Sequence, residues 1–208
     1  MDTVNNARTM PWKVAIEPFR VAPRVWYVGN TWVGSFLIQT SEGLALIDTT
    51  VMEDLYLIDS IHRLGFDPKD LKHIFLTHAH MDHDGAARAL KELTGAKVWL
   101  SREDEEWRHR PEADMSDTGF SIVPYETDCF YEDETPIVMG DVVIRTRLSA
   151  GHTPGTTSFF VEMKDEEGKT VVWGMHGGVG INTMNTDYLQ KVRLPLSLQE
   201  DFSGAARR

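Results

Sequence analysis

Residues 77–85 form a dense cluster of potential metal ligands and read Thr-His-Ala-His-Met-Asp-His-Asp-Gly. An apolar run, Ile74 to Leu76, precedes the cluster, and a helix-like segment, Gly85 to Leu90, follows it. The cluster therefore lies at the end of a predicted strand, where a loop can turn several side chains toward one point. Imidazole nitrogens and carboxylates are ligands that a borderline divalent ion such as zinc prefers. The sequence thus predicts a metal site at a strand end.

The spacing within this cluster suggests two neighbouring metal positions. His78 and His80 are two positions apart, so extended backbone between them places both rings on the same side. The chain then turns through Asp82 and His83, which suggests that these two side chains hold a second ion. The alternative is a polar surface loop that contains histidines by chance. Three of the chain's eight histidines within six positions argue against that alternative.

A further histidine lies between two predicted strands, in the loop Gly151-His152-Thr153-Pro154-Gly155. Glycine and proline give such a loop a tight, fixed shape. Alone, a histidine in this setting is more often structural than catalytic. Together with His78 and His80, however, His152 could complete a set of three nitrogen ligands. Three protein ligands and one open position for water form the arrangement of a catalytic zinc site.

Length and charge limit the classes of function. The 208 residues are enough for one domain with a real core, and we expect residues 1–208 to form a single domain. The 21 Lys and Arg against 32 Asp and Glu argue against a nucleic-acid partner, because such proteins concentrate positive charge. The N-terminus lacks a signal-peptide pattern, and no apolar run approaches the roughly 18 residues of a membrane span. We therefore expect a cytoplasmic protein with a small-molecule substrate and no membrane partner.

Short apolar runs alternate with helical patterns along the chain, which favours a mixed fold with two packed sheets. Gly65 and Gly95 are expected to end two helices, the first with Leu55, Ile58, Ile61 and Leu64 on one face and the second with Leu90 and Leu93. Glu103, Asp104, Glu105 and Glu106 are expected to form a solvated helical face, and the tail from Thr186 is expected to be helical. Strands are expected at Arg24–Val28, Val33–Gln39, Leu44–Asp48, Ile74–Leu76, Lys97–Leu100, Val142–Leu148, Thr157–Val161 and Thr170–Trp173.

The two motifs resemble the signature of the metallo-β-lactamase superfamily, a His-x-His-x-Asp-His sequence after a strand followed later by a Gly-His-Thr-Pro-Gly loop. The likeness runs from about Val25 to Trp173, and its flanks look closest to the B3 subclass and related hydrolases. This resemblance implies an α/β fold of the αββα sandwich type, with metals at one edge of the two sheets. The resemblance is weak evidence for the substrate, because members of the superfamily hydrolyse lactams, lactones, thioesters, phosphoesters and sulfate esters.

The resemblance also implies a role for each candidate residue. His78, His80 and His152 would hold the first ion, and Asp82 and His83 would hold the second. Asp82 would in addition act in catalysis by orienting the attacking water. The expected cofactor is zinc, one or two ions per chain, although the ligand set also suits iron or manganese. A metal-activated hydroxide would then attack a cyclic amide or ester.

Two departures from the family pattern concern the second ion. Met175 stands where many members carry an aspartate that bridges the metals, although the B3 subclass also lacks that aspartate. His176 is a tentative further ligand, and its alternative is a surface histidine at a strand end. No histidine follows His176, so the chain is expected to lack the last strand and helix of the family, including the final histidine. An unpaired sheet edge would then favour a homodimer.

Three functions remain open at this point. The first is hydrolysis of a β-lactam-like or lactone-like substrate. The second is a lactonase, thioesterase or other esterase, which the missing signal-peptide pattern favours. The third is a truncated, weakly active or non-catalytic binding or assembly module, which Met175 and the missing histidine favour. The side chains expected either to line the cleft or to belong to the core are Phe120, Tyr125, Phe130 and Tyr131.

Overall fold

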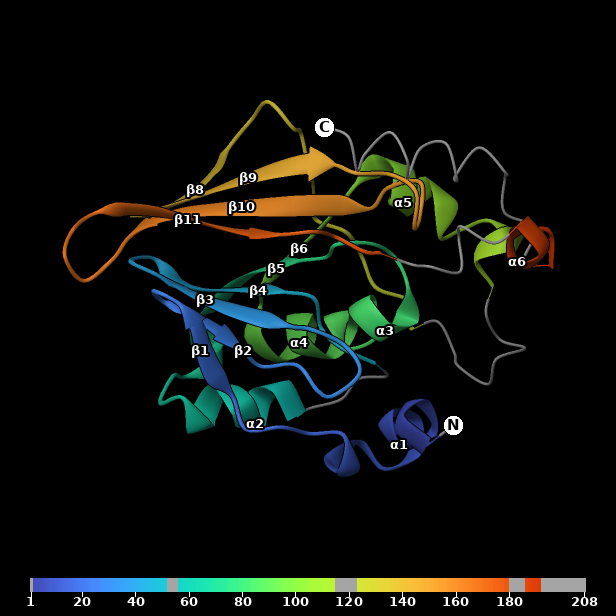
Figure 1. The fold of residues 1–208 in the computed structure, drawn as a ribbon, viewed down its shortest axis with the longest axis horizontal. Helices are drawn as coiled ribbons and strands as arrows, with labels where there is room; N and C mark the ends of the chain where they lie inside the picture. The colour runs from blue at the N-terminus through green and yellow to red at the C-terminus, as the bar shows by residue number, and fades with distance from the viewer. Residues whose placement is uncertain (1, 52–55, 115–122, 180–185, 192–208) are drawn as a thin grey trace.

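Two β-sheets packed face to face form the centre of the molecule (Figure 1). The structure is a computed structural model that describes residues 2–51, 56–114, 123–179 and 186–191. One sheet contains β1 (Phe19–Ala22), β2 (Val25–Tyr27), β3 (Phe36–Thr40), β4 (Gly43–Ile47), β5 (Leu71–Phe75), β6 (Lys97–Leu100) and β7 (Cys129–Phe130), in that order. The other contains β8 (Ile137–Met139), β9 (Val142–Leu148), β10 (Thr157–Lys164) and β11 (Thr170–Met175), in the spatial order β11-β10-β9-β8.

Strand direction differs between the two sheets. In the seven-stranded sheet, β1 to β4 are antiparallel neighbours, whereas β4 to β7 run parallel. The four-stranded sheet is antiparallel throughout. The helices are α1 (Asp2–Thr9), α2 (Tyr56–Arg63), α3 (Met81–Asp84), α4 (Ala87–Thr94), α5 (Arg102–Trp107) and α6 (Thr186–Lys191), with 3-10 turns η1 (Pro11–Lys13), η2 (Pro68–Asp70) and η3 (Pro111–Ala113). Among the described residues, no helix combines the length and apolar character needed to cross a membrane.

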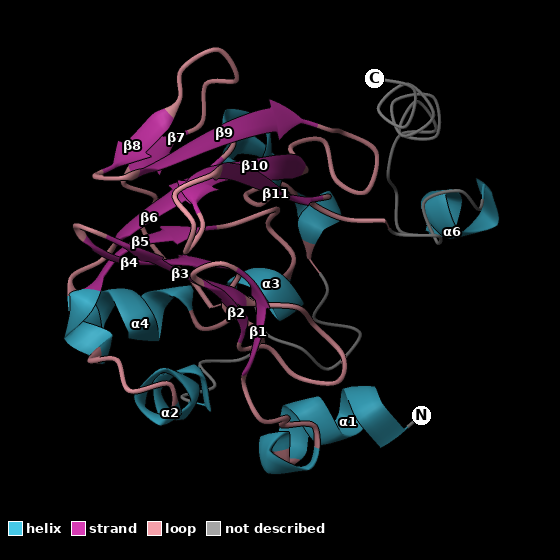
Figure 2. Ribbon diagram, turned by 60° about the vertical axis from the view of Figure 1, so that its left-hand side comes forward, coloured by secondary structure: helices cyan, strands magenta, loops and turns pink. Residues whose placement is uncertain are grey.

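Two apolar cores hold these layers together. The first lies between the seven-stranded sheet and helices α2 and α4, which cover the outer face of that sheet in both views (Figures 1 and 2). The second lies between the sheets, where Phe75 of β5 meets Phe159 of β10. Successive side chains of a strand point to opposite faces, so Leu46 faces the helices and Ile47 faces the other sheet. A strand buried on both faces is therefore apolar throughout, as β4 is.

The strands expected from the sequence are present, with ends that shift by a few residues, and the structure adds β1, β7 and β8. Helix α4 ends as expected, because Gly95 adopts φ +74° and its N–H donates to Lys91 O at 2.8 Å. The expectation that Leu90 and Leu93 share the apolar face of this helix is wrong. Leu90 is fully buried, whereas Leu93 is 53% exposed. Residues three apart on a helix diverge by about 60°, and the buried face of this short helix is narrow.

The expected solvated face of α5 is also corrected. Asp104 has 0% of its surface exposed, although Glu103 and Glu106 beside it are exposed. Its carboxylate is turned inward, toward two loops that leave the sheets. The four acidic residues were expected to share one solvated face, but successive residues of a helix point in directions about 100° apart, so they do not all face water. The buried carboxylate is a feature of the tertiary packing.

The loops that carry the candidate ligands leave both sheets at the same end. The segment after β5 contains His78 and His80, and the connection between β9 and β10 contains His152. The backbone ties these two segments together directly, since Thr157 N donates to Thr77 O at 2.8 Å. The fold therefore places the segment after β5 of one sheet next to the β9–β10 connection of the other.

Candidate metal centre

The imidazoles of His78, His80 and His152 converge at this shared end of the two sheets. One ligand nitrogen from each ring lies within 4.8 Å of the others, and His80 Nδ1 lies 3.0 Å from His152 Nε2. Nitrogens on one tetrahedral zinc lie about 3.3 Å apart, because each is about 2.0–2.1 Å from the ion. The three side chains therefore fit a divalent ion, and the grouping is the one that the sequence suggested.

Hydrogen bonds of His78 show which of its nitrogens is available. His78 Nδ1 lies 3.1 Å from the carbonyl oxygen of Gly177. A carbonyl oxygen only accepts, so we assign the proton to Nδ1. His78 Nε2 is buried and has no hydrogen-bond partner in the protein. A buried polar atom without a partner costs free energy, and a metal ion bound at Nε2 would be such a partner.

Burial keeps the three rings neutral, which is the form that binds a metal. Burial and the nearby His83 lower the pKa of His78 well below its usual value. Burial and the neighbouring His152 do the same to the pKa of His80. Burial and His83 lower the pKa of His152 to about 4. At neutral pH each ring therefore has one nitrogen with a lone pair, and that nitrogen can bind a metal.

Asp82 and His83 lie beside this group on the one-turn helix α3. Asp82 Oδ2 is 3.7 Å from His83 Nε2, and the centroids of the His78 and His83 rings are 4.1 Å apart. His83 Nδ1 lies 2.8 Å from the carboxylate of Asp48, which leaves Nε2 on the side of Asp82. Burial opposes the charged form of His83, but the charge and hydrogen bond of Asp48 raise its pKa to about 9. In the metal-free protein this ring therefore favours its protonated form at neutral pH.

Asp48 is a supporting residue that the sequence did not single out. It follows β4, is fully buried and adopts φ +60°. Its carboxylate accepts from Thr77 N at 2.8 Å and from the Thr77 hydroxyl at 2.9 Å, besides His83. The position of Asp48 directly after an apolar strand could have indicated this role, because a carboxylate buried there needs hydrogen-bond donors.

His176 does not belong to the group of three histidines that converge on one point. Its side chain is exposed, and its Nδ1 accepts from Gly178 N at 3.1 Å. Within the part of the chain that the structure describes, the one group of three potential ligands around a common point is His78, His80 and His152. Met175, which precedes His176, packs against the core between the sheets. A role of His176 as a ligand of the second ion stays a prediction.

The aromatic candidates are mainly core residues. Tyr131 is buried between the sheets, and its hydroxyl lies 3.0 Å from both Leu76 O and Trp99 O. Tyr125 belongs to the core under the helices. Phe130 is half-buried beneath the Arg102 guanidinium, and Phe120 lies outside the described residues. Trp107 of α5, which the sequence did not single out, has its ring centroid 5.4 Å from that of His80.

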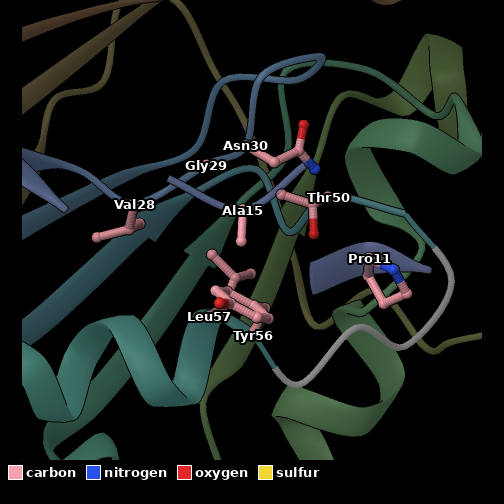
Figure 3. A pocket seen from close by; sticks show the side chains of 8 residues that line it. All are labelled: Pro11, Ala15, Val28, Gly29, Asn30, Thr50, Tyr56 and Leu57. Carbon is pink, nitrogen blue, oxygen red and sulfur yellow. The ribbon is translucent and has the colours of Figure 1, made fainter. Parts of the chain in front are cut away.

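A small cavity beside the N-terminal segment has none of these candidate ligands in its lining (Figure 3). Its volume is about 10 Å³, which is roughly the space of one water and too small for an organic substrate. Thr50 Oγ1 and Asn30 Nδ2 are buried without a partner. The residues that line the cavity are Pro11, Ala15, Val28, Gly29, Asn30, Thr50, Tyr56 and Leu57.

Comparison with known proteins gives the same fold. The chain is 30% identical to the metallo-β-lactamase GOB-18 from Elizabethkingia meningoseptica, with a TM-score of 0.80 over 94% of this chain and 73% of that one. It is 27% identical to BJP-1, a subclass B3 metallo-β-lactamase of Bradyrhizobium japonicum, with a TM-score of 0.74 over 90% of this chain and 74% of that one. The expected sandwich fold and the likeness to the B3 subclass are confirmed.

Among curated sequences, the chain is similar to the N-acyl homoserine lactonase AttM of Agrobacterium fabrum, with 28% identity over 126 residues. The match covers 55% of this chain and 45% of AttM. The chain thus spans about half the length of the curated relatives it matches. The profile described as "Metallo-beta-lactamase superfamily" matches residues 33–193, which is most of the chain. The two histidine motifs, the paired sheets and this match agree, and the protein belongs to the metallo-β-lactamase superfamily.

Proposed function

We propose that this protein is a metal-dependent hydrolase that opens a cyclic amide or ester of the β-lactam or lactone type. The observation that carries the proposal is the convergence of three neutral imidazoles on one point, with His78 Nε2 buried and unpartnered. A divalent ion held there supplies a water whose pKa is lowered toward about 7, and polarises the bond under attack. We propose zinc as the ion, one or two per chain, with iron and manganese as the alternatives that this ligand set suits.

Asp82 is the residue to which we assign the catalytic role. Its side chain is 21% exposed, so it reaches the solvent side of the centre, where substrate enters. A carboxylate in this position orients the attacking water and accepts its proton. His83 and Asp82 form the second ligand pair, and Asp48 holds the His83 ring in place from behind.

The relatives support two substrate classes that a direct assay separates. Named relatives include a lactonase of 28% identity and a β-lactamase of 30% identity. Zinc-loaded protein is to be assayed with a chromogenic β-lactam and, by proton release, with an N-acyl homoserine lactone. Turnover that disappears in His80→Ala supports the hydrolase, and the preferred substrate identifies the class. His62→Ala is the matched control, because His62 is an exposed histidine on α2.

The third possibility, a binding or assembly module, has its own outcome in that assay. Wild-type protein that binds zinc but turns over neither substrate, nor a simple thioester or ester, contradicts the hydrolase.

We also propose a cytoplasmic location and a homodimer, the latter because β11 is the last strand at one side of its sheet. Light scattering of the purified protein tests the dimer, and a monomer at micromolar concentration contradicts it.

A further inference from the structure

Asp104 is a buried carboxylate directly behind the metal centre. It lies in the first turn of α5, where its N–H is capped by the Ser101 hydroxyl at 3.1 Å. Its exposed surface is 0%. Among the described residues, no cationic side chain forms an ion pair with it. A buried carboxylate of this kind is tolerated only when several donors satisfy its oxygens.

The donors that satisfy Asp104 come from the two loops that carry the metal ligands. Ala79 N donates to Asp104 Oδ2 at 2.8 Å, and Ala79 lies between His78 and His80. From the other loop, Gly155 N donates to Oδ1 at 2.7 Å, and the Thr153 hydroxyl donates to Oδ2 at 2.8 Å. One side chain thus joins the loop after β5 to the loop between β9 and β10.

Close packing reinforces this junction. A Cβ atom added to Gly155 would lie 2.7 Å from Asp104 Cγ and would collide with Ser101 Oγ. The loop that carries His152 therefore rests directly on the start of α5, with no room for a side chain. The distance between the two loops is fixed by contact as well as by hydrogen bonds.

A carboxylate is required here because of how the donors are arranged. Both oxygens must accept, one from Gly155 and the other from Ala79 and Thr153. An asparagine of the same shape has one accepting oxygen and one donating NH₂ group. In either orientation, its NH₂ group faces a backbone N–H, so one of the two loops loses its bond. Asp104→Asn therefore releases one ligand loop without changing the volume of the side chain.

We propose that Asp104 is a positioning residue that sets the spacing between His152 and the His78–His80 pair, and so the affinity and geometry of the first metal position. This inference rests on the metal site of the proposed function, but it does not depend on the substrate. Groups that orient metal ligands from outside the coordination sphere typically change metal affinity about 10- to 100-fold. We expect a loss of that size on disconnecting either loop.

The test compares Asp104→Asn with Asp128→Asn in the full chain. Asp128 also accepts a backbone N–H, from Val98 at 2.8 Å, but it pairs with Lys91 and is not among the three-ligand group. Zinc affinity is measured by competition with a chromogenic chelator, and ligand geometry by the visible spectrum of the cobalt(II) form. We expect Asp104→Asn to weaken zinc binding about 10- to 100-fold and to change the cobalt spectrum. Asp128→Asn is expected to leave both as in the wild type.

Gly155→Ala provides a second variant that keeps the carboxylate intact, in case Asp104→Asn fails to fold. It is expected to change the cobalt spectrum in the same way, because it pushes the His152 loop off α5. Wild-type affinity and spectrum in the folded variants overturn the inference, as does an equal effect of Asp128→Asn. Wild-type protein that binds no ion overturns the inference together with the proposed function. Protein that behaves as expected here but hydrolyses nothing overturns only the proposed function.

Discussion

His83 and Asp48 form an imidazole–carboxylate pair, with Nδ1 of the partly exposed His83 2.8 Å from Oδ2 of the fully buried Asp48. The pair joins α3 to the end of β4, and the same carboxylate also accepts from the backbone and hydroxyl of Thr77. A hydrogen bond at Nδ1 fixes the orientation of the ring and leaves Nε2 free to bind a metal. Asp48 therefore supports both candidate metal positions from behind.

Asp48→Asn is expected to weaken the second metal position more than the first. The amide removes the charge that holds the His83 ring, and a lost ligand support of this kind costs about 10- to 100-fold in metal affinity. Zinc per chain, measured after dialysis against a weak chelator, is expected to fall by one ion in a wild type that holds two. Asp141→Asn is the control, because Asp141 bonds Ser41 N and Arg24 instead. Unchanged zinc content in Asp48→Asn would contradict this role.

His176→Ala separates the two interpretations of that histidine. If His176 binds the second ion, the variant loses that ion alone and keeps the one at His78, His80 and His152. If it is a surface histidine, zinc content and metal affinity stay at wild-type values. The exposed ring and its bond to Gly178 N lead us to expect the second result. Elemental analysis of the purified variant gives the answer, and His109→Ala, another exposed histidine, serves as its control.

Thr50→Gly is expected to stabilise the fold. Thr50 is β-branched yet adopts φ +61°, and its buried hydroxyl has no partner. Relief of this strain outweighs the added chain entropy of glycine and is expected to raise the free energy of unfolding by about 1 kcal/mol. Urea unfolding of the metal-free protein measures the change. Thr49→Gly is expected to do the opposite, because the Thr49 hydroxyl bonds both His83 O and Ala86 N.

Glu105 is expected to make stability depend on acid pH. Burial opposes its charge, but hydrogen bonds from Arg108, Thr127 and His109 lower its pKa from 4.5 to about 2. A carboxylate with a depressed pKa stabilises the fold above its unfolded-state pKa and loses that contribution as the pH falls. The difference in unfolding free energy between wild type and Glu105→Gln, both metal-free, is therefore expected to shrink between about pH 4.5 and pH 2. A difference that stays constant across this range would show that the charge of Glu105 contributes nothing.

The parts of the site that the sequence predicted are those with a local signature. His78 and His80 share a short segment after an apolar strand, and His152 lies in a loop shaped by glycine and proline. Each motif contains enough information to specify its own conformation. Their convergence followed from the resemblance to a known family, since nothing local places two segments 72 residues apart side by side.

The parts that the sequence missed depend on contacts between distant segments. Asp104 lies in an acidic run, and its burial arises from bonds to Ala79 and Gly155, which are 25 and 51 residues away. Strand β7 has two residues and β1 has three exposed side chains in four, so neither shows the apolar alternation that marks a strand. The single-domain organisation of residues 1–208 stays a prediction.

The division of the ligand set between the two sheets has a consequence for how the chain matures. Synthesis from the N-terminus produces His78 and His80 before His152, which lies in the hairpin of the second sheet. A nascent chain that ends before this hairpin offers only two of the three nitrogens. The three-histidine group is therefore complete only after the later half of the chain has been made and has packed against the first sheet.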